Sequence, residues 1–257
     1  MGVFDAYLKN YSKPGPGVNE PVPKKGPKRY WHLLKNHFTK MVGINLLYAI
    51  TFIPIYAAFA LRQSLGMYSL LFFLLLLFMP AFRTACTRAM MVIARQGNCF
   101  VLYEFKKEVF AEFFKRLFAT ICILILPVAY WCMVGVTGNI IGFGTALGLT
   151  AIVFVIFAYL FPMWAITDIP VGKCVKNAIL LTMLEWKKSL LIVVGSLLPS
   201  IVCFLFIPFS VPLIVLVLYA LTWLFEAMLV NTALIKHNII PEADGEEEDK
   251  EAETENE

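Results

Sequence analysis

The chain contains few charged residues for its length. Only 16% of its 257 residues are Asp, Glu, Lys or Arg, whereas a typical soluble domain has about 25%. Residues of the hydrophobic class make up 60% of the chain. Because a soluble protein must keep most of its exterior polar, this composition excludes an ordinary soluble domain. It indicates that much of the protein surface faces lipid.

The sequence also lacks the common motifs of catalysis, phosphate binding and metal binding. None of the patterns GxxxxGK[ST], GxGxxG, HExxH or GxSxG occurs in it. Its six cysteines form no CxxC pair, and none of its three histidines lies near them at a ligand spacing. We therefore expect no enzyme, no catalytic residue, no metal and no cofactor. We interpret the cysteines as small apolar side chains.

What the sequence does contain is a series of long apolar segments. Each is close to or above the ~20 residues that a helix needs to cross ~30 Å of hydrocarbon. Strands with open edges cannot satisfy their backbone groups in lipid, so the segments predict helices. We expect an all-α polytopic membrane protein with about six transmembrane helices in three hairpins, at residues 42–61, 67–94, 117–136, 141–164, 189–207 and 211–235.

Three regions follow from this pattern. Residues 1–29 are rich in Pro, Gly and Lys, and proline restricts both itself and its neighbours, so a flexible basic arm is expected. Residues 30–240 form the transmembrane domain. Residues 241–257 form a tail with ten acidic residues and one lysine. This composition predicts a disordered acidic segment.

The charges of the connecting loops predict the orientation in the membrane. Residues 1–41 hold eight Lys and Arg, the loop 95–116 holds five, and the loop 165–188 holds four. The connections between these basic regions hold a single Arg. Cytoplasmic loops carry the excess of positive charge, so we expect both termini in the cytoplasm and three short outer turns.

The same layout indicates an internal repeat of three units. In each unit a basic amphipathic stretch, expected at the membrane surface, leads into an apolar helix that contains a proline. The three stretches begin at Tyr30, Tyr103 and Val175 and read YWHLLKNHFTKM, YEFKKEVFAEFFKRLF and VKNAILLTMLEWKKSL. The prolines are Pro54, Pro127 and Pro199. The alternative is that any six-helix protein with basic inner loops has this appearance.

Several segments resemble the YesL-like family of bacterial membrane proteins. They are KPGPGV with PKKGPKRYW in the arm, NLLYAITFIP at 45–54, and the two segments 80–118 and 161–191. The sequence departs from the family pattern at Met79-Pro80-Ala81, where members often carry Gly-Pro-Ala. The family's biochemical role is not established. The resemblance implies a place beside carbohydrate uptake and polysaccharide-use systems of the bacterial cytoplasmic membrane.

Ionisable residues inside a membrane are costly, so each one is a candidate for function. Glu226 lies about 15 residues, or ~22 Å, below an outer turn, and Arg83 lies about 16 residues, or ~24 Å, below another. These matching depths predict an ion pair between Arg83 and Glu226, which either only stabilises packing or serves a proton or a solute. Arg88 lies deeper, and we expect it to reach lipid headgroups.

Three other polar residues stand at the cytoplasmic edge of the predicted helices. Asp168 precedes Ile169-Pro170 and is expected to cap the next helix, with a cation or substrate contact as the alternative. Asn45 and Asn177 are expected to hydrogen-bond across helices. The pattern Gly144-x-x-x-Gly148 is a weak indication of close helix packing.

Two classes of function fit these observations. The first is a non-enzymatic accessory or scaffold protein that assists a transport or envelope system, with transporter subunits or a second copy of the chain as partner. The second is a transporter or channel for a small solute. The basic loops are explained by membrane topology and anionic lipid headgroups, so nucleic acid is not an expected partner.

Overall fold

The computed structural model describes residues 26–61, 66, 77–96, 99–138, 140–206 and 209–241, and within these residues every regular element is a helix. No strand occurs in the described part of the chain. The predicted arm and tail lie almost entirely outside it. The first helix begins at Pro27, three residues before the expected start at Tyr30. The prediction of an all-α architecture is confirmed.

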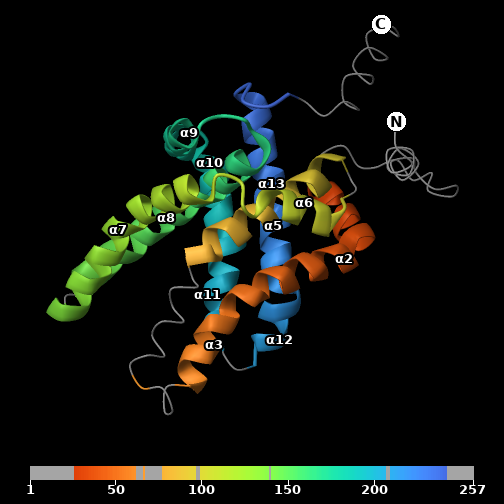
Figure 1. The fold of residues 1–257 in the computed structure, drawn as a ribbon. Coiled ribbons are helices and arrows are strands. Elements are labelled where there is room, and N and C mark those ends of the chain that lie inside the picture. The colour runs from red at the N-terminus through yellow and green to blue at the C-terminus, as the bar shows by residue number, and fades with distance from the viewer. Residues whose placement is uncertain are drawn as a thin grey trace, which may run out of the picture.

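The helices follow one another with short connections (Figure 1). The N-terminal part consists of α2 (Pro27–Ala49), the short 3₁₀ element η1 (Ile50–Phe52), α3 (Ile53–Ala60), α5 (Met79–Gln96) and α6 (Val101–Glu108). The middle part is the pair α7 (Phe113–Thr137) and α8 (Ile140–Ile166). The C-terminal part consists of α9 (Val171–Leu184), α10 (Trp186–Ile192), η3 (Val193–Leu197), α11 (Leu198–Leu205), α12 (Val211–Leu213), η4 (Ile214–Leu218) and α13 (Tyr219–Lys236).

Four of the helical stretches are long and apolar enough to cross a membrane. They are Phe113–Thr137, Ile141–Ile166, Trp186–Cys203 and Val211–Lys236. They coincide with the last four of the six predicted segments. The first predicted segment is divided among α2, η1 and α3, and residues 67–76 of the second lie outside the described residues. The chain is therefore multi-pass by helix length and composition, with four such helices among the described residues.

The second helices of the predicted hairpins lie at the centre of the molecule. Helix α5 packs against both α8 and α13, and α2 packs across α5 and α13. One apolar core joins α8, α9 and α13 around residues such as Tyr159 and Leu234, and another joins α2, α5 and α13 around Met41, Met90 and Leu224. The end of the α7–α8 hairpin around its connecting turn projects away from this bundle (Figure 1).

Each of the three predicted repeat units has a backbone break before its apolar helix. The break lies at His37 inside α2, at Glu112 between α6 and α7, and at Glu185 between α9 and α10. In each unit an aromatic residue follows the break directly and a lysine lies three residues after it, in the sequences HFTK (37–40), EFFK (112–115) and EWKK (185–188). This shared order of parts agrees with an internal repeat.

Two of the helices contain π-helical turns, in which the backbone bond spans five residues instead of four. These are η3 between α10 and α11, and η4 between α12 and α13. In η3, Gly195 is required for packing, because a Cβ atom there would lie 2.3 Å from the ring of Phe225. By contrast, a Cβ at Gly144 or Gly148 would meet nothing within 4 Å. Among the described residues, this pair of glycines makes no close helix contact, contrary to the weak indication in the sequence.

Candidate functional site

A cavity of about 440 Å³ lies among the central helices, and the Arg83–Glu226 pair lines it. Its wall is formed by side chains of α2, α5, α7, α8, α11 and α13. The Nη2 atom of Arg83 on α5 donates to the Oε2 atom of Glu226 on α13 at 2.5 Å. The structure therefore brings together the two residues whose depths in the sequence matched.

Aromatic rings enclose the cationic member of this pair. The guanidinium carbon of Arg83 lies 3.8 Å from the ring centre of Trp223 and 5.7 Å from that of Phe161. The negative face of an aromatic ring attracts a cation, most strongly when water is excluded. Only 12% of the Arg83 side chain and 4% of the Glu226 side chain are exposed. The pair is thus held in a mostly buried, largely apolar site.

The pair leaves two buried polar atoms without a partner. Within the described residues, Nη1 of Arg83 and Oε1 of Glu226 form no hydrogen bond. A buried polar group without a partner costs about 1–3 kcal/mol, and native structures contain few of them. One unused donor and one unused acceptor therefore belong to residues that line the same cavity.

Asn45 connects α2 to the π-helical turn beside the cavity. Its side-chain amide donates to the carbonyl oxygens of Ile214 at 2.7 Å and Val215 at 2.6 Å. Its Oδ1 atom accepts from the backbone N–H of Ala220 at 2.8 Å. The side chain is fully buried. The hydrogen bonds across helices that were expected of Asn45 are present, and they stabilise the irregular turn η4.

Arg88 does not lie where the sequence predicted it. Instead of reaching lipid headgroups, it donates from Nε to Glu104 at 2.6 Å and from Nη1 to Glu108 at 3.1 Å. It also donates to the carbonyl oxygen of Ala165, at the C-terminal end of α8. The expectation was wrong because α6 folds back beside α5 and presents two carboxylates to the guanidinium.

Glu108 and Arg116 complete this network, and neither was among the residues predicted to form a site. Arg116 on α7 donates to Glu108 at 2.5 Å and to the carbonyl oxygen of Trp164 at 2.9 Å. We call Arg88, Glu108 and Arg116 the arginine clamp. Its two cations bind the last carbonyl groups of α8, where cations are favourable. The available signal was a carboxylate pair four residues apart, Glu104 and Glu108, on an otherwise basic stretch.

The other two polar residues at the predicted edge behave differently. Asp168 is exposed and does not cap the next helix, because the N-cap position of α9 is Pro170 and no side chain caps it. That expectation was wrong, because Asp168 lies two residues before the N-cap position of α9. Asn177 is half-buried on α9, and within the described residues its side chain has no hydrogen bond to another helix.

Glu185, at the break before α10, is a buried carboxylate that was not among the predicted site residues. Its Oε1 atom accepts from Lys236 at 2.6 Å and lies 2.9 Å from Nε2 of His237. The hydrogen bond from Lys236, followed by that from His237 and the charge of Lys188, lowers the pKa of Glu185 to about 2 against the effect of burial. It therefore ties the end of α13 to the start of α10.

Other chemistry is sparse among the described residues. They contain no group of three His, Cys, Asp or Glu side chains that could hold a metal ion. No disulfide joins the six cysteines, all of which lie within the described residues, and Cys86, Cys99 and Cys174 are buried. The polar chemistry inside the protein is therefore that of the cavity pair and of the carboxylates bound by basic residues.

Comparisons with protein-family models, with curated proteins and with solved structures found no match for this chain. The resemblance to the YesL-like family therefore stays a prediction.

Proposed function

We propose that the protein is a multi-pass protein of the bacterial cytoplasmic membrane that binds a small neutral solute in its central cavity and carries it across the membrane. The observation that supports this proposal is a cavity of about 440 Å³ that is lined by the Arg83–Glu226 ion pair in an otherwise largely apolar and aromatic wall. That volume lies in the range of roughly 300–1,000 Å³ typical of small-molecule sites. The proposal involves no chemical step.

The arrangement of the cavity favours a particular class of solute. Because Arg83 and Glu226 neutralise each other, an ion entering the cavity would add an uncompensated charge, which is costly in a buried site. A hydroxyl group both donates and accepts a hydrogen bond without carrying a charge, so it is complementary to a neutral pair of one donor side chain and one acceptor side chain. The remaining wall is mostly apolar and aromatic, with Tyr48, Tyr219 and Trp223 among its residues. A hydroxylated solute with an apolar face, such as a polyol or a sugar, fits these features.

The irregular helices beside the cavity are a second feature that supports transport. Solute sites of transporters are often formed by interrupted membrane helices, and π-helical turns are frequent at functional sites. Here η3 and η4 lead directly into α11 and α13, which contribute Ser200, Tyr219 and Thr222 to the cavity wall. The cavity is therefore bounded by the two helices with the least regular backbone bonding.

The proposed orientation places both termini and all basic loops in the cytoplasm. It rests on the excess of Lys and Arg in those loops. The arginine clamp lies at the loop-side end of α8, where two of the basic loops meet. Anionic headgroups of the inner leaflet would be the lipid neighbours of this face.

The test is solute binding to the purified full-length chain in lipid nanodiscs. Thermal unfolding would be recorded with a panel of polyols, sugars, amino acids and organic anions, because a bound solute raises the unfolding temperature. We expect the hydroxylated neutral solutes alone to raise it. The double variant Arg83→Met/Glu226→Leu should lose the shift, while Lys187→Gln, an exposed charge away from the cavity, should keep it. Uptake of the same solute into proteoliposomes then separates transport from binding.

A second candidate function is the accessory role that the family resemblance implies. The α7–α8 hairpin supports it, because it projects from the bundle (Figure 1) and exposes large apolar side chains, including Phe114 at 81% and Val136 at 89%. Such a face can pack against a partner subunit or a second copy as well as against lipid. Purification in mild detergent followed by mass spectrometry separates these cases. A stoichiometric transporter subunit would favour the accessory role, and a chain purified alone would favour the carrier.

A further inference from the structure

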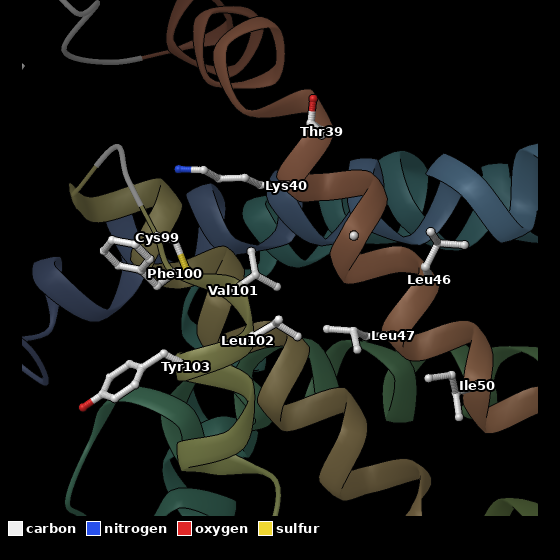
Figure 2. Close-up of a pocket in the computed structure, with 11 residues that line it drawn as sticks. Thr39, Lys40, Leu46, Leu47, Ile50, Cys99, Phe100, Val101, Leu102 and Tyr103 are labelled. Atoms are coloured by element: carbon white, nitrogen blue, oxygen red, sulfur yellow. The ribbon is translucent and has the colours of Figure 1, made fainter. Parts of the chain in front are cut away.

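An apolar groove of about 1,100 Å³ lies between α2 and α6, away from the central cavity. Figure 2 shows its two walls. One is formed by Gly43, Leu46, Leu47 and Ile50 along α2 and η1, and the other by residues 99–103 at the start of α6. Large apolar side chains are exposed on both walls, such as Leu46 at 45% and Leu102 at 71%.

The polar groups of this groove are concentrated at one end. Thr39 and Lys40 stand there, and the side chain of Lys40 extends across that end toward Cys99 (Figure 2). The residues further along α2 that line the groove are all apolar. The groove is therefore amphiphilic along its length, with a cation at one end and a hydrocarbon-like wall beyond it.

The length of the groove matches one leaflet of a bilayer. Lys40 and Ile50 are ten residues apart on a helical path, which corresponds to about 15 Å at 1.5 Å per residue. Half of a hydrocarbon core of ~30 Å is also about 15 Å. In addition, Lys40 stands where α2 changes from the basic stretch YWHLLKNHFTK to the apolar stretch MVGINLLYAI, a change expected where a helix passes from lipid headgroups to acyl chains.

We propose that this groove is a binding site for one anionic phospholipid of the cytoplasmic leaflet. The lipid phosphate lies against the Lys40 ammonium, and an acyl chain runs along Leu46, Leu47 and Ile50. A single cation at one end of an apolar wall complements a molecule with one anionic end and a long hydrocarbon part. A partner helix would not need the charge, and a water-soluble anion would not need the wall.

Gly43 offers a direct way to close this groove. It lines the wall, and a Cβ atom built there would meet nothing within 4 Å. The Cβ atom of a leucine at this position is therefore accommodated, and the rest of the side chain would project from the wall of the groove. Gly144 on α8 is a matched control, because it too is a helical glycine with open space around its Cβ position. It is not one of the residues that line the groove.

The experiment is native mass spectrometry of the full-length chain, with phosphatidylglycerol or phosphatidylcholine added to the detergent solution. We expect the first phosphatidylglycerol to bind at least tenfold more tightly than phosphatidylcholine. Lys40→Gln should remove this preference, whereas Lys35→Gln, an exposed lysine of the same helix outside the groove, should retain it. Gly43→Leu should weaken both lipids, whereas Gly144→Leu should not.

Three results would overturn the proposal. The first is equal binding of the two lipids to the unaltered chain. The second is the same loss of preference in Lys35→Gln as in Lys40→Gln, which would indicate a diffuse charge effect. The third is unchanged lipid binding in Gly43→Leu. The unfolding temperature of each variant, measured in parallel, identifies any that fails to fold, and Lys40→Gln and Gly43→Leu test different parts of the site independently.

Discussion

Two buried arginine–glutamate groups in this protein use similar side chains in different ways. In the arginine clamp both oxygens of Glu108 accept hydrogen bonds, and its arginines also bind backbone carbonyl groups of α8. In the cavity, Arg83 and Glu226 share one hydrogen bond, and each keeps a buried polar atom without a partner. Among the side-chain atoms of the clamp, Nε of Arg116 alone is buried without a hydrogen bond within the described residues.

The difference separates a structural network from a site that can accept a ligand. The clamp joins α5, α6, α7 and α8 through bonds that the protein itself completes. The Arg83–Glu226 ion pair itself links α5 to α13 through a single hydrogen bond. Removal of charge should therefore affect stability most at the clamp, and affect solute binding most at the cavity.

The largest loss of stability is expected for Glu108→Ala. It leaves two buried arginines without their shared counter-charge, and breaking a buried ion pair in this way costs about 3–5 kcal/mol. The measurement is thermal unfolding in detergent, with Glu108→Gln as the variant that preserves the shape and part of the hydrogen bonding. A fall in unfolding temperature no larger than that of an exposed variant such as Glu112→Ala would contradict the role of the clamp.

A smaller loss is expected when the cavity wall is loosened through Asn45. Hydrogen bonds between membrane helices contribute about 0.6 kcal/mol each on average, so Asn45→Ala, which removes three, should lower the free energy of unfolding by about 2 kcal/mol. Asn177→Ala removes no such bond and is the matched control. Equal unfolding temperatures for the two variants would show that the contacts of Asn45 with η4 carry no weight.

The cavity pair should respond to removal quite differently from the clamp. Replacing a buried ion pair by apolar residues of similar size is often neutral or stabilising by about 1–4 kcal/mol. We therefore expect Arg83→Met/Glu226→Leu to unfold at the same temperature as the unaltered chain or higher, while solute binding falls at least tenfold. Strong destabilisation of this double variant would place the pair with the clamp as a purely structural feature.

The smallest effect concerns acid stability at Glu185. Because its pKa is lowered to about 2 in the folded chain, its bonds stabilise the protein above the ordinary carboxyl pKa of about 4.3, and this contribution is lost as the pH falls toward 2. Lys236 is 63% exposed, so we expect only about 1 kcal/mol after screening. Unfolding temperatures of the unaltered chain and of Glu185→Gln, measured from pH 7 to pH 3, should converge at the acid end. A constant difference would count against this assignment.

The sequence was sufficient to predict those features that follow from hydropathy and depth. The four long apolar helices begin and end within a few residues of the predicted segments, because lipid thickness imposes a minimum length on each. The pairing of Arg83 with Glu226 followed from equal distances to the outer turns. In both cases a distance counted along the chain corresponds to a position along the axis of a long helix.

Contacts that depend on how the chain folds back were not predictable in this way. Arg88 was assigned to lipid because the path of α6 beside α5 is not encoded in the periodicity of either helix. Glu108 and Glu185 resembled ordinary charges of basic loops, although the structure buries both of them against cations. The π-helical turns were also missed, since nothing in VVGSL or IVLVL distinguishes them from regular helix.

Those π-helical turns have a consequence for how this protein can change by insertion and deletion. A π turn accommodates one residue more than the α-helical turn that it replaces, and one residue corresponds to a rotation of about 100° around a helix axis. Deleting a single residue from η4 would restore a regular helix and leave Trp223 and Glu226 on about the same face of it, whereas a deletion from the regular first turn of α13 would turn them relative to all that precedes them. The number of residues in this helix, as well as their identity, therefore determines which side chains face the cavity.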